Sequence, residues 1–566
     1  MRDAARVFAT FSLCHALRSA FLIPHRLSPL SLSALLLALL VAMPVLSVLF
    51  NLLQGGTGGT WAHMASTVLP EYIASTLWLC LWVGLGTALV GVSTAWASVM
   101  WEFPGRRVFD WALVLPLATP AYVMAYTYTD LLQFVGPVQT ALRETFGWER
   151  GDYWFPDVRT TGGAAFMFIA VLYPYVYLLT RQSLIERAGG LNDAARMLGQ
   201  GAWAAFFRVS LPLARPAIAA GVALALMETL ADYGTVSYFG VQTFTTGIYR
   251  AWFSLGDRVA AAQLAALLLA FVASLLLAER LSRGGARFHD GSRAGASSRR
   301  HVLPRRIGWV VSAACLVPLS VGFIVPGVVL LNWAFAEGDA QFGERFLHLA
   351  ANSFTLAAVA SVCAVALALL LAYAARTSRS RIVRAARSVV GLGYAVPGAV
   401  IAVGILIPVT RLDHLLSGLW LQWTGSNPGL VLTGGISALI YAYLARFLTV
   451  SLQSVESGLS RITPSMDEAA RSLGLNASQT LRRVHWPMLR GSLLTAALLV
   501  FVDVMKELPA TLVMRPFNFD TLATQAYTLA SDERLHEAST AALAIVVVGL
   551  LPLIALSRQI ARSRRD

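Results

Sequence analysis

A polar segment occurs twice in this chain, and the two copies stand 275 residues apart in otherwise apolar sequence. In each copy an acidic residue is followed by two alanines and an arginine. A glycine comes six residues after each acid and a proline nineteen residues after it. Such a fixed offset across a long chain indicates a duplicated unit that carries the same device in each copy. The matching residues are Asp193, Ala194, Ala195, Gly199 and Pro212 in the first copy and Glu468, Ala469, Ala470, Gly474 and Pro487 in the second.

The chain is too apolar to form a soluble globule. Of its 566 residues 57% are hydrophobic and 13% are charged. Apolar segments of ~20 residues, the length that spans a bilayer as a helix, recur throughout. We therefore predict an all-α membrane protein with twelve spans, with ten or thirteen as alternatives. The predicted spans cover 30–50, 72–100, 110–132, 163–181, 213–235 and 259–279, then 307–332, 352–375, 388–410, 429–450, 491–513 and 538–557.

The distribution of the net charge of +14 argues against nucleic acid as a partner. Arginines crowd alternate loops, whereas residues 51–71 hold no Arg or Lys. This is the positive-inside pattern, so both termini and both copies of the motif are expected to face the cytoplasm. Residues 1–28 are basic and lead into the first apolar stretch without a convincing cleavage site, which favours an uncleaved first span.

The repeat and the charge pattern together predict the domain organisation. Because each half has an even number of spans, the halves are parallel repeats with the same orientation in the membrane. A Gly-, Ser- and Arg-rich stretch is typical of a linker between them. The predicted segments are a cytoplasmic N-terminal segment 1–28, a first transmembrane domain 29–281 with a motif loop at 188–212, a linker 282–306, a second transmembrane domain 307–558 with a motif loop at 463–487, and a cytoplasmic tail 559–566.

Each motif loop is expected to hold a short helix that projects from the bilayer. Asn192 or Ser465 is a suitable cap for its start, because short polar side chains accept hydrogen bonds from the first turn. The motif glycine suits the end of the helix or a sharp turn. The motif proline is expected to restart the chain toward the next span.

The two segments resemble the EAA signature of the inner-membrane permeases of ABC importers, which reads E-A-A, three residues, G, nine residues, I-x-L-P. The second copy, "EAARSLGLNASQTLRRVHWP", departs from it at Val484 and Trp486. The first, "DAARMLGQGAWAAFFRVSLP", has Asp193 for Glu and Val209 for Ile. The resemblance implies that each motif helix sits in a groove of an ATPase subunit and passes on its closure. Two ATPase copies are therefore expected as partners.

The chain itself offers no nucleotide site. A P-loop ends in Gly-Lys-Ser/Thr, but the only lysine is Lys506 and no Gly-rich sequence precedes it. We therefore expect ATP with Mg²⁺ to bind and react on the partner ATPase, and we expect no cofactor, metal ligand or catalytic residue in this chain. Dispersed residues carry little signal: His63, His348, His414 and His536 in outward loops, the scattered Cys14, Cys80, Cys315 and Cys363, and Tyr122, Tyr126 and Tyr128, which suit helix packing or a pore lining.

Acidic residues occur four apart in the fifth predicted span of each half. Glu228 and Asp232 in the first half match Asp503 and Glu507 in the second, and this spacing would place each pair on one helix face. Ionisable groups at membrane depth normally face the bundle interior or a water-filled path. Two readings stay open, a ring of acids that lines a cation path and an ion-pair network that closes a gate. Lys506 is expected to neutralise one of the acids.

Two further stretches are similar to the ferric-iron subgroup of ABC permeases, in which both membrane domains are fused in one chain. They are "ETLADYGTVSYFGVQTFTTGIYRAW" and "KELPATLVMRPFNFDTLATQAY". The resemblance implies that a periplasmic binding protein delivers ferric iron, which crosses a bacterial inner membrane by alternating access. Importers of thiamine or phosphonate-type solutes share this layout. Secondary transporters also fuse two six-span halves, but they need no motif loops. A metal-dependent membrane enzyme would show His/Glu clusters at ligand spacing.

One outward loop, 133–162, is rich in aromatic residues. Trp and Tyr favour the membrane interface, so an interfacial anchor is one interpretation. A docking surface for an outside protein is the other.

Overall fold

The computed structural model describes residues 29–52, 59–185, 195, 197–283, 300–336, 342–378 and 380–562. Within these ranges eleven helices are long and apolar enough to cross a bilayer, and two helical stretches that meet at 91° give a twelfth passage. The predicted count of twelve agrees with this. The long helices are α2 (Pro29–Leu52), α4 (Leu69–Met100), α8 (Thr161–Ser183), α11 (Leu211–Ala231) and α14 (Arg258–Arg283), then α15 (Arg305–Leu319) with α16 (Val325–Leu331), α17 (Glu344–Thr377), α19 (Gly398–Thr424), α20 (Ser437–Ser460), α23 (Trp486–Met505) and α26 (Leu535–Arg562).

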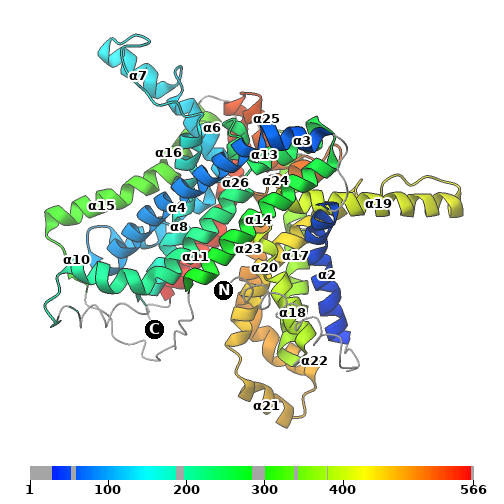
Figure 1. Ribbon diagram of the computed structural model, residues 1–566. Coiled ribbons are helices and arrows are strands. Elements are labelled where there is room, and N and C mark those ends of the chain that lie inside the picture. The colour runs from blue at the N-terminus through cyan, green and yellow to red at the C-terminus, as the bar shows by residue number, and fades with distance from the viewer. Residues whose placement is uncertain are drawn as a thin grey trace, which may run out of the picture.

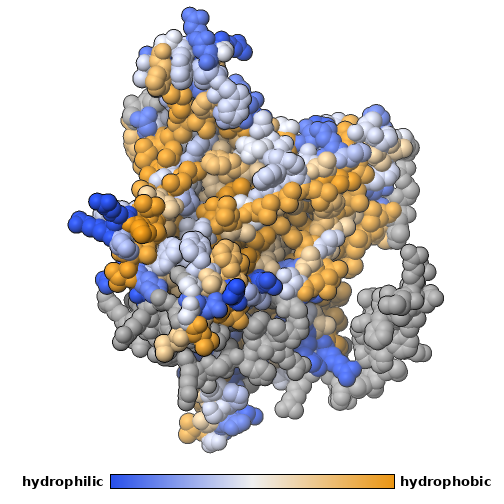
Figure 2. Space-filling model, turned by 60° about the vertical axis from the view of Figure 1, so that its left-hand side comes forward, coloured by the Kyte–Doolittle hydropathy of each residue, from blue (hydrophilic) through white to orange (hydrophobic). Residues whose placement is uncertain are grey.

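A band of hydrophobic side chains covers the middle of the molecule, while hydrophilic residues gather toward its upper and lower ends (Figure 2). Large apolar side chains such as Leu81, Leu89 and Val362 are more than half exposed along the spans. Water would make such a surface costly, whereas lipid chains cover it without penalty. The surface is therefore that of a membrane protein.

The first helix of each half packs against the other half. Helix α2 lies beside α17, α19 and α18 (Arg381–Val390) of the second half (Figure 1). The α15–α16 segment, joined by the π turn η5 (Ser320–Ile324), lies against α4, α8 and α5 (Arg106–Ala112) of the first half. Glycines permit both contacts: a Cβ on Gly404 would lie 2.2 Å from the carbonyl oxygen of Pro44, and one on Gly322 would lie 2.4 Å from that of Ala170. Each half thus completes the core of the other.

The third passage of each half is broken, so the predictions of continuous spans over 110–132 and 388–410 were wrong. In the first half α5, the 3₁₀ turn η1 (Leu115–Ala118) and α6 (Ala121–Leu132) follow one another. In the second, α18, η7 (Gly393–Ala395) and α19 do the same. The breaks fall at Pro120 and Pro397, which have extended backbone with ψ of 144° and 143°. Proline lacks an N–H and disfavours helix in the residue before it.

Two outward projections extend from the bundle (Figure 1). One holds α7 (Pro137–Phe146), beyond which Phe146, Trp148 and Tyr153 stack in series. The other is the end of α19, where Asp413 accepts hydrogen bonds from the backbone N–H groups of residues 431–433. Because that loop occupies 425–436, α20 begins at Ser437 and the predicted span 429–450 began too early.

Short elements complete the chain. Two two-residue strands, β1 (Trp101–Glu102) and β2 (His301–Val302), pair in parallel. The short helices and turns outside the functional site are α3 (Gly59–Thr67), α13 (Phe244–Tyr249), η4 (Arg250–Ser254), η6 (Asn332–Ala336) and α25 (Leu522–Ser531).

Candidate functional site

The second motif loop forms a short projecting helix, α21 (Pro464–Ser472), at the lower end of the bundle (Figure 1). Within this helix Ala470 is buried, whereas Glu468 and Ala469 are exposed, as is Leu473 just after it. The helix ends at Ser472, and Gly474 follows its C-cap with a φ of +78°, in the left-handed region that glycine adopts without strain. The predicted projecting helix is therefore confirmed in the second copy, where Glu468 and Ala469 are exposed and Ala470 is turned inward.

The first motif loop ends in the same way over the residues that the structure describes. Gly199 has a φ of +81°, and Gln200 donates to the carbonyl of Ala195 as Leu475 donates to that of Ala470, each at 3.0 Å. These are the bonds of a helix C-terminus closed by a left-handed residue. The predicted contact residues Asp193 and Ala194 lie outside the described residues.

The expected helix cap was wrong in the second copy. The N-cap is Thr463, with Pro464 in the first helical position. Ser465 lies inside the first turn and exchanges a 2.8 Å hydrogen bond with the Thr463 hydroxyl. Proline fixes the start of the helix, because its φ suits the first position and it has no N–H to satisfy. The alternative cap, Asn192, falls outside the described residues.

The motif prolines also differ from expectation, because neither restarts the chain. Pro212 and Pro487 lie within helices that have already begun at α10 (Ala202–Ala205) and α22 (Ala477–Thr480). A π turn precedes each proline, η3 (Phe206–Ser210) and η8 (Leu481–His485). The wider π turn shifts the backbone hydrogen-bond register just before the proline, which has no N–H to donate. The helix therefore continues through the proline into the next span. Both π turns keep the 275-residue offset.

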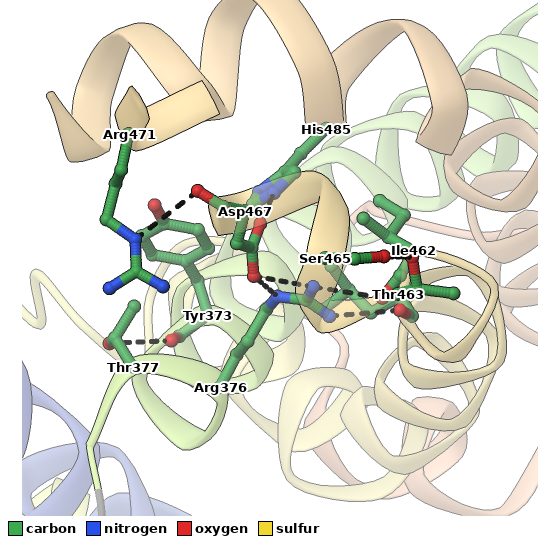
Figure 3. Close-up of polar contacts among 10 residues, drawn as sticks. Tyr373, Arg376, Thr377, Ile462, Thr463, Ser465, Asp467, Arg471 and His485 are labelled. Atoms are coloured by element: carbon green, nitrogen blue, oxygen red, sulfur yellow. Dashed lines mark hydrogen bonds and ion pairs between the residues drawn. The ribbon is translucent and has the colours of Figure 1, made fainter. Parts of the chain in front are cut away.

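A polar cluster ties α21 to the rest of the second half (Figure 3). Asp467 accepts hydrogen bonds from the Nε and Nη2 atoms of Arg376, at 3.0 and 2.7 Å, and its other oxygen lies 2.7 Å from His485 Nε2. Partial burial opposes ionisation, but these hydrogen bonds and the Arg376 charge hold the pKa of Asp467 below its usual value. The sequence interpretation assigned no role to these three residues, since none stands at a defined position of the motif.

The membrane acids lie where two helices break. Helix α11 ends at Ala231 and α12 (Gly234–Tyr238) follows; α23 ends at Met505 and α24 (Pro509–Met514) follows. Asp232 and Glu507 therefore lie beyond the helix ends, and the prediction that each acid pair shares one helix face was wrong. Helix-breaking residues, Gly234 and Pro509, come two residues after each acid.

Asp232 and Glu507 instead cap the next short helix. Asp232 accepts from the backbone N–H groups of Thr235 and Val236, at 2.9 and 3.2 Å. Glu507 accepts from those of Ala510 and Thr511, at 2.9 and 3.0 Å. Inside a membrane the free N–H groups of a helix start need such partners, because no water is present to accept them. The two breaks are thus built alike.

A single arginine bridges the two halves at these breaks. Arg446, on α20, places Nη2 3.9 Å from an oxygen of Glu228 and Nη1 3.6 Å from an oxygen of Glu507. Tyr394 donates a 2.7 Å hydrogen bond to Glu228. Arg446 was missed by the sequence interpretation, although a lone arginine inside the predicted span 429–450 was a usable signal.

The remaining charges pair as expected. Lys506 Nζ lies 3.0 Å from Asp503 Oδ1, which confirms the predicted neutralisation. All five predicted residues line one cavity of about 120 Å³, which Arg446, Tyr175 and Tyr394 share. Four acids and two bases face it, so the ring is not purely acidic. No cluster of three His, Cys, Asp or Glu residues that could hold a metal ion occurs within the described part of the chain.

The predicted tyrosine run divides between the two interpretations. Tyr122 lines the cavity. Tyr128 instead donates a 2.8 Å hydrogen bond to the carbonyl of Val321, in the π turn η5 of the second half, and so serves helix packing.

The family described as binding-protein-dependent transport system inner membrane component matches residues 87–283 and 364–566. This chain belongs to that family. The double match agrees with the two repeats, and as an ABC importer permease the protein is a multi-pass component of the inner membrane. Over 541 residues the chain is 25% identical to the Fe(3+)-transport system permease protein FbpB 2 of Haemophilus influenzae, covering 94% of this chain and 98% of that one.

Other relatives carry different names. The putative ferric transport system permease protein FbpB 1 of Haemophilus influenzae is 22% identical over 85% of this chain and 76% of its own length. The molybdenum transport system permease protein ModB of Escherichia coli is 30% identical over 34% of this chain and 84% of its own length. A probable sulfate transport system permease of Chlorokybus atmophyticus is 31% identical over 39% and 74%.

Proposed function

We propose that this permease is the whole membrane part of an ATP-driven importer and that its cargo is ferric iron. The relative that matches nearly end to end is named for Fe(3+) transport, which supports the cargo. The two motif loops support attachment of two ATPase copies, which bind ATP with Mg²⁺. The arginine-rich alternate loops support cytoplasmic termini, with a periplasmic binding protein docking on the opposite face.

The ATPase contacts are the projecting motif residues. In the second copy Glu468 and Ala469 are exposed on α21, above the buried Ala470 and the turn at Gly474. Pro487 and Pro212 follow the π turns that lead directly into α23 and α11. A push on either loop is therefore transmitted along a continuous helix to the acid-bearing break. Asp193, Ala194, Ala195 and Gly199 take the corresponding role in the first copy.

The observation that carries the mechanism is the bridge made by Arg446. One guanidinium from the second half faces Glu228 of the first half and Glu507 of its own half, with 9% of its side chain exposed. Rocking of the halves has to separate this contact, so the arginine and acids form a gate that closes one arrangement of an alternating-access cycle. Asp232, Asp503 and Lys506 line the same passage.

The hydrogen bonds favour the gate over a cation-binding ring. Asp232 and Glu507 already accept hydrogen bonds from backbone N–H groups. Glu228 faces the Tyr394 hydroxyl and the Arg446 guanidinium, and Asp503 faces the Lys506 ammonium group. A hard cation requires several free oxygen ligands in one place. Acids already engaged in this way are suited to closing the passage rather than holding iron there.

Oxyanion cargo is the second candidate, because relatives named for sulfate and molybdenum transport match 39% and 34% of the chain. Arg446 and Lys506 would supply positive charge to such a cargo. Each is paired with an acid, however, which lowers the charge that an anion would meet. Thiamine and phosphonate-type solutes remain further alternatives.

Uptake into proteoliposomes tests the proposal. The permease is reconstituted with its ATPase and binding protein, and accumulation of radiolabelled iron(III), molybdate, sulfate and thiamine is compared with and without ATP. We expect ATP-dependent accumulation of iron(III) alone. ATP-dependent accumulation of another solute would contradict iron(III) as the cargo but not the proposal of an ATP-driven importer. Accumulation that follows an ion gradient without ATP would instead indicate a secondary transporter.

A further inference from the structure

The far end of α19 leaves the bundle and runs sideways beside the upper end of α2, whereas α21 lies at the lower end of the molecule (Figure 1). Up to Val409 the helix is mostly buried, and Gly404 packs against Pro44 of α2. Between residues 410 and 424, all of which the structure describes, Asp413 is the only buried residue. This end of α19 therefore presents most of its side chains away from the bundle.

The exposed end of α19 has one apolar side. Leucines and tryptophans recur there every three or four residues, a spacing that places them along one side of a helix. Leu415, Leu419 and Trp423 are 66%, 50% and 86% exposed. The apolar row consists of Leu412, Leu415, Leu416, Leu419, Trp420 and Trp423, and Leu421 is the one leucine of this stretch outside it.

The polar side of the same helix holds the loop that leads back to α20. Asp413 accepts hydrogen bonds from the backbone N–H groups of residues 431–433, two of them at 2.8 Å. One turn further along the helix, Ser417 donates a hydrogen bond to the carbonyl of Gly429. The loop thus runs back along the polar side and leaves the apolar row exposed.

The chemistry of the apolar row fits the boundary between lipid chains and water. The row contains no charged residue, so a soluble protein that docked on it would gain no electrostatic guidance. A helix with leucines and tryptophans on one side and polar groups on the other lies in the membrane interface with its apolar side in the lipid. Helix α19 also packs against α2, whose exposed Leu46, Phe50 and Leu52 belong to the lipid-covered surface of the spans.

The other end of α19 reaches the charged gate. A Cβ on Gly398, the first residue of the helix, would lie 2.7 Å from Glu507 Oε1 and 2.9 Å from Arg446 Nη1. One helix therefore runs from the gate to the apolar row. If its far end is fixed in the bilayer, the movement of its near end against the gate is restricted.

We propose that residues 411–424 form an amphipathic anchor that lies in the lipid interface of the leaflet opposite α21, and that this anchor holds the gate end of α19 in place. The partner is the lipid surface, and the apolar row makes the contact. The link to the gate rests on the proposed function, whereas the contact with lipid does not.

Spin labels on the two sides of the helix test the anchor in proteoliposomes of phosphatidylcholine and phosphatidylglycerol. The four native cysteines are replaced by alanine, and a nitroxide is attached at Leu419→Cys or at His414→Cys, an exposed residue on the polar side. Collisions of each label with oxygen, which concentrates in lipid, are compared with collisions with a water-soluble nickel complex. We expect the label on Leu419→Cys to favour oxygen and the label on His414→Cys to favour the nickel complex.

Two outcomes would overturn the anchor. One is access of the nickel complex to both labels. The other is a label on Leu419→Cys that is open to the nickel complex until the binding protein is added, because this would assign the apolar row to protein docking.

A charge placed on each side of the helix tests the link to the gate. Leu419→Asp puts a carboxylate into the lipid, which opposes it, and aspartate is too short to reach back to water as lysine does. His414→Asp adds the same group on the polar side and is the matched control. Both variants are compared at equal amounts of copurified ATPase, so that a folding defect is not counted as a loss of uptake.

We expect Leu419→Asp to lose most of its ATP-dependent uptake and His414→Asp to keep the wild-type level. Equal uptake by the two variants would overturn the link between the anchor and the gate. A wild-type permease without ATP-dependent uptake would instead remove the proposed function, and the label measurement needs neither ATP nor cargo.

Discussion

Asp232 in the first half and Glu507 in the second both accept backbone hydrogen bonds from the helix that follows them, yet the charges around them differ. Lys506 precedes Glu507, whereas Ala231 precedes Asp232. Arg446 lines the cavity from α20, and Tyr175 lines it from the corresponding helix α8. Both basic groups in the cavity therefore belong to the second half. The duplication has kept the backbone arrangement and changed the charges.

The motif loops show the same division. Left-handed glycines, matching C-terminal hydrogen bonds and π turns recur in both copies. Charged side chains that hold the loop occur in the second copy, at positions where the 275-residue offset gives the first copy Trp101, Asn192 and Ser210. Backbone devices of this kind are costly to alter, because they satisfy the carbonyl groups that the end of a helix leaves without a partner. The charged side chains next to these backbone features can differ between the two copies.

The largest expected effect comes from removing the bridging charge. Arg446→Gln leaves Glu228 and Glu507 without their shared cation, and breaking a buried pair costs about 3–5 kcal/mol. We expect loss of ATP-dependent uptake and a lower melting temperature, measured by proteoliposome transport and thermal unfolding in detergent. Tyr175→Phe changes a cavity residue on the corresponding helix α8 of the first half and should keep most of the uptake. Equal losses in the two variants would contradict the assignment of the gate charge to the second half.

A smaller difference is expected between the two capping acids. Glu507→Gln loses both a capping carboxylate and the partner of Arg446, and should destabilise the fold by about 2 kcal/mol. Asp232→Asn loses the capping charge alone and should cost about 1 kcal/mol. Thermal unfolding of the purified variants measures both. A larger loss for Asp232→Asn would show that Arg446 does not distinguish the breaks.

Substitution of the motif glycines should affect both copies alike. Gly199→Ala and Gly474→Ala place a side chain at positive φ, which costs roughly 1 kcal/mol. An added Cβ meets no atom within 4 Å at either position, so the cost is in the backbone. We expect similar, modest reductions in copurified ATPase. Unchanged uptake and ATPase association after replacing both glycines by bulky residues would argue against the motif loops as ATPase contacts.

The smallest effect concerns pH and Asp467. Its pKa is lowered in the folded protein, so its contribution to stability is complete above the ordinary aspartate pKa of about 3.9 and is lost as the pH falls through the lowered value. The difference in melting temperature between wild type and Asp467→Asn should therefore shrink as the pH falls below about pH 4. A difference that persists unchanged below about pH 3 would assign the effect to another group.

Features that follow from short-range pattern were predicted from the sequence. Hydropathy found the spans, and the repeat found the motif glycines and the five charged residues of the cavity. Hydropathy does not detect helix breaks. The sequence therefore predicts continuous helix at Pro120, at Pro397 and after Ala231 and Met505, where the structure has breaks. The role of Arg376 and the packing of each first helix against the other half depend on contacts between residues far apart in sequence, which no local pattern encodes. Arg446 was marked in the sequence by its lone charge within a predicted span.

The exchange of α2 and α15–α16 has a consequence for assembly. Helix α2 of the first half packs against the second half, and the α15–α16 segment of the second half packs against the first. Neither half can therefore complete its hydrophobic core alone. During synthesis α2 has to wait in the bilayer until α17 to α19 have been inserted. Once both halves are complete, the crossed helices hold them together, and cutting the peptide chain between Arg283 and Arg300 should leave the two pieces associated.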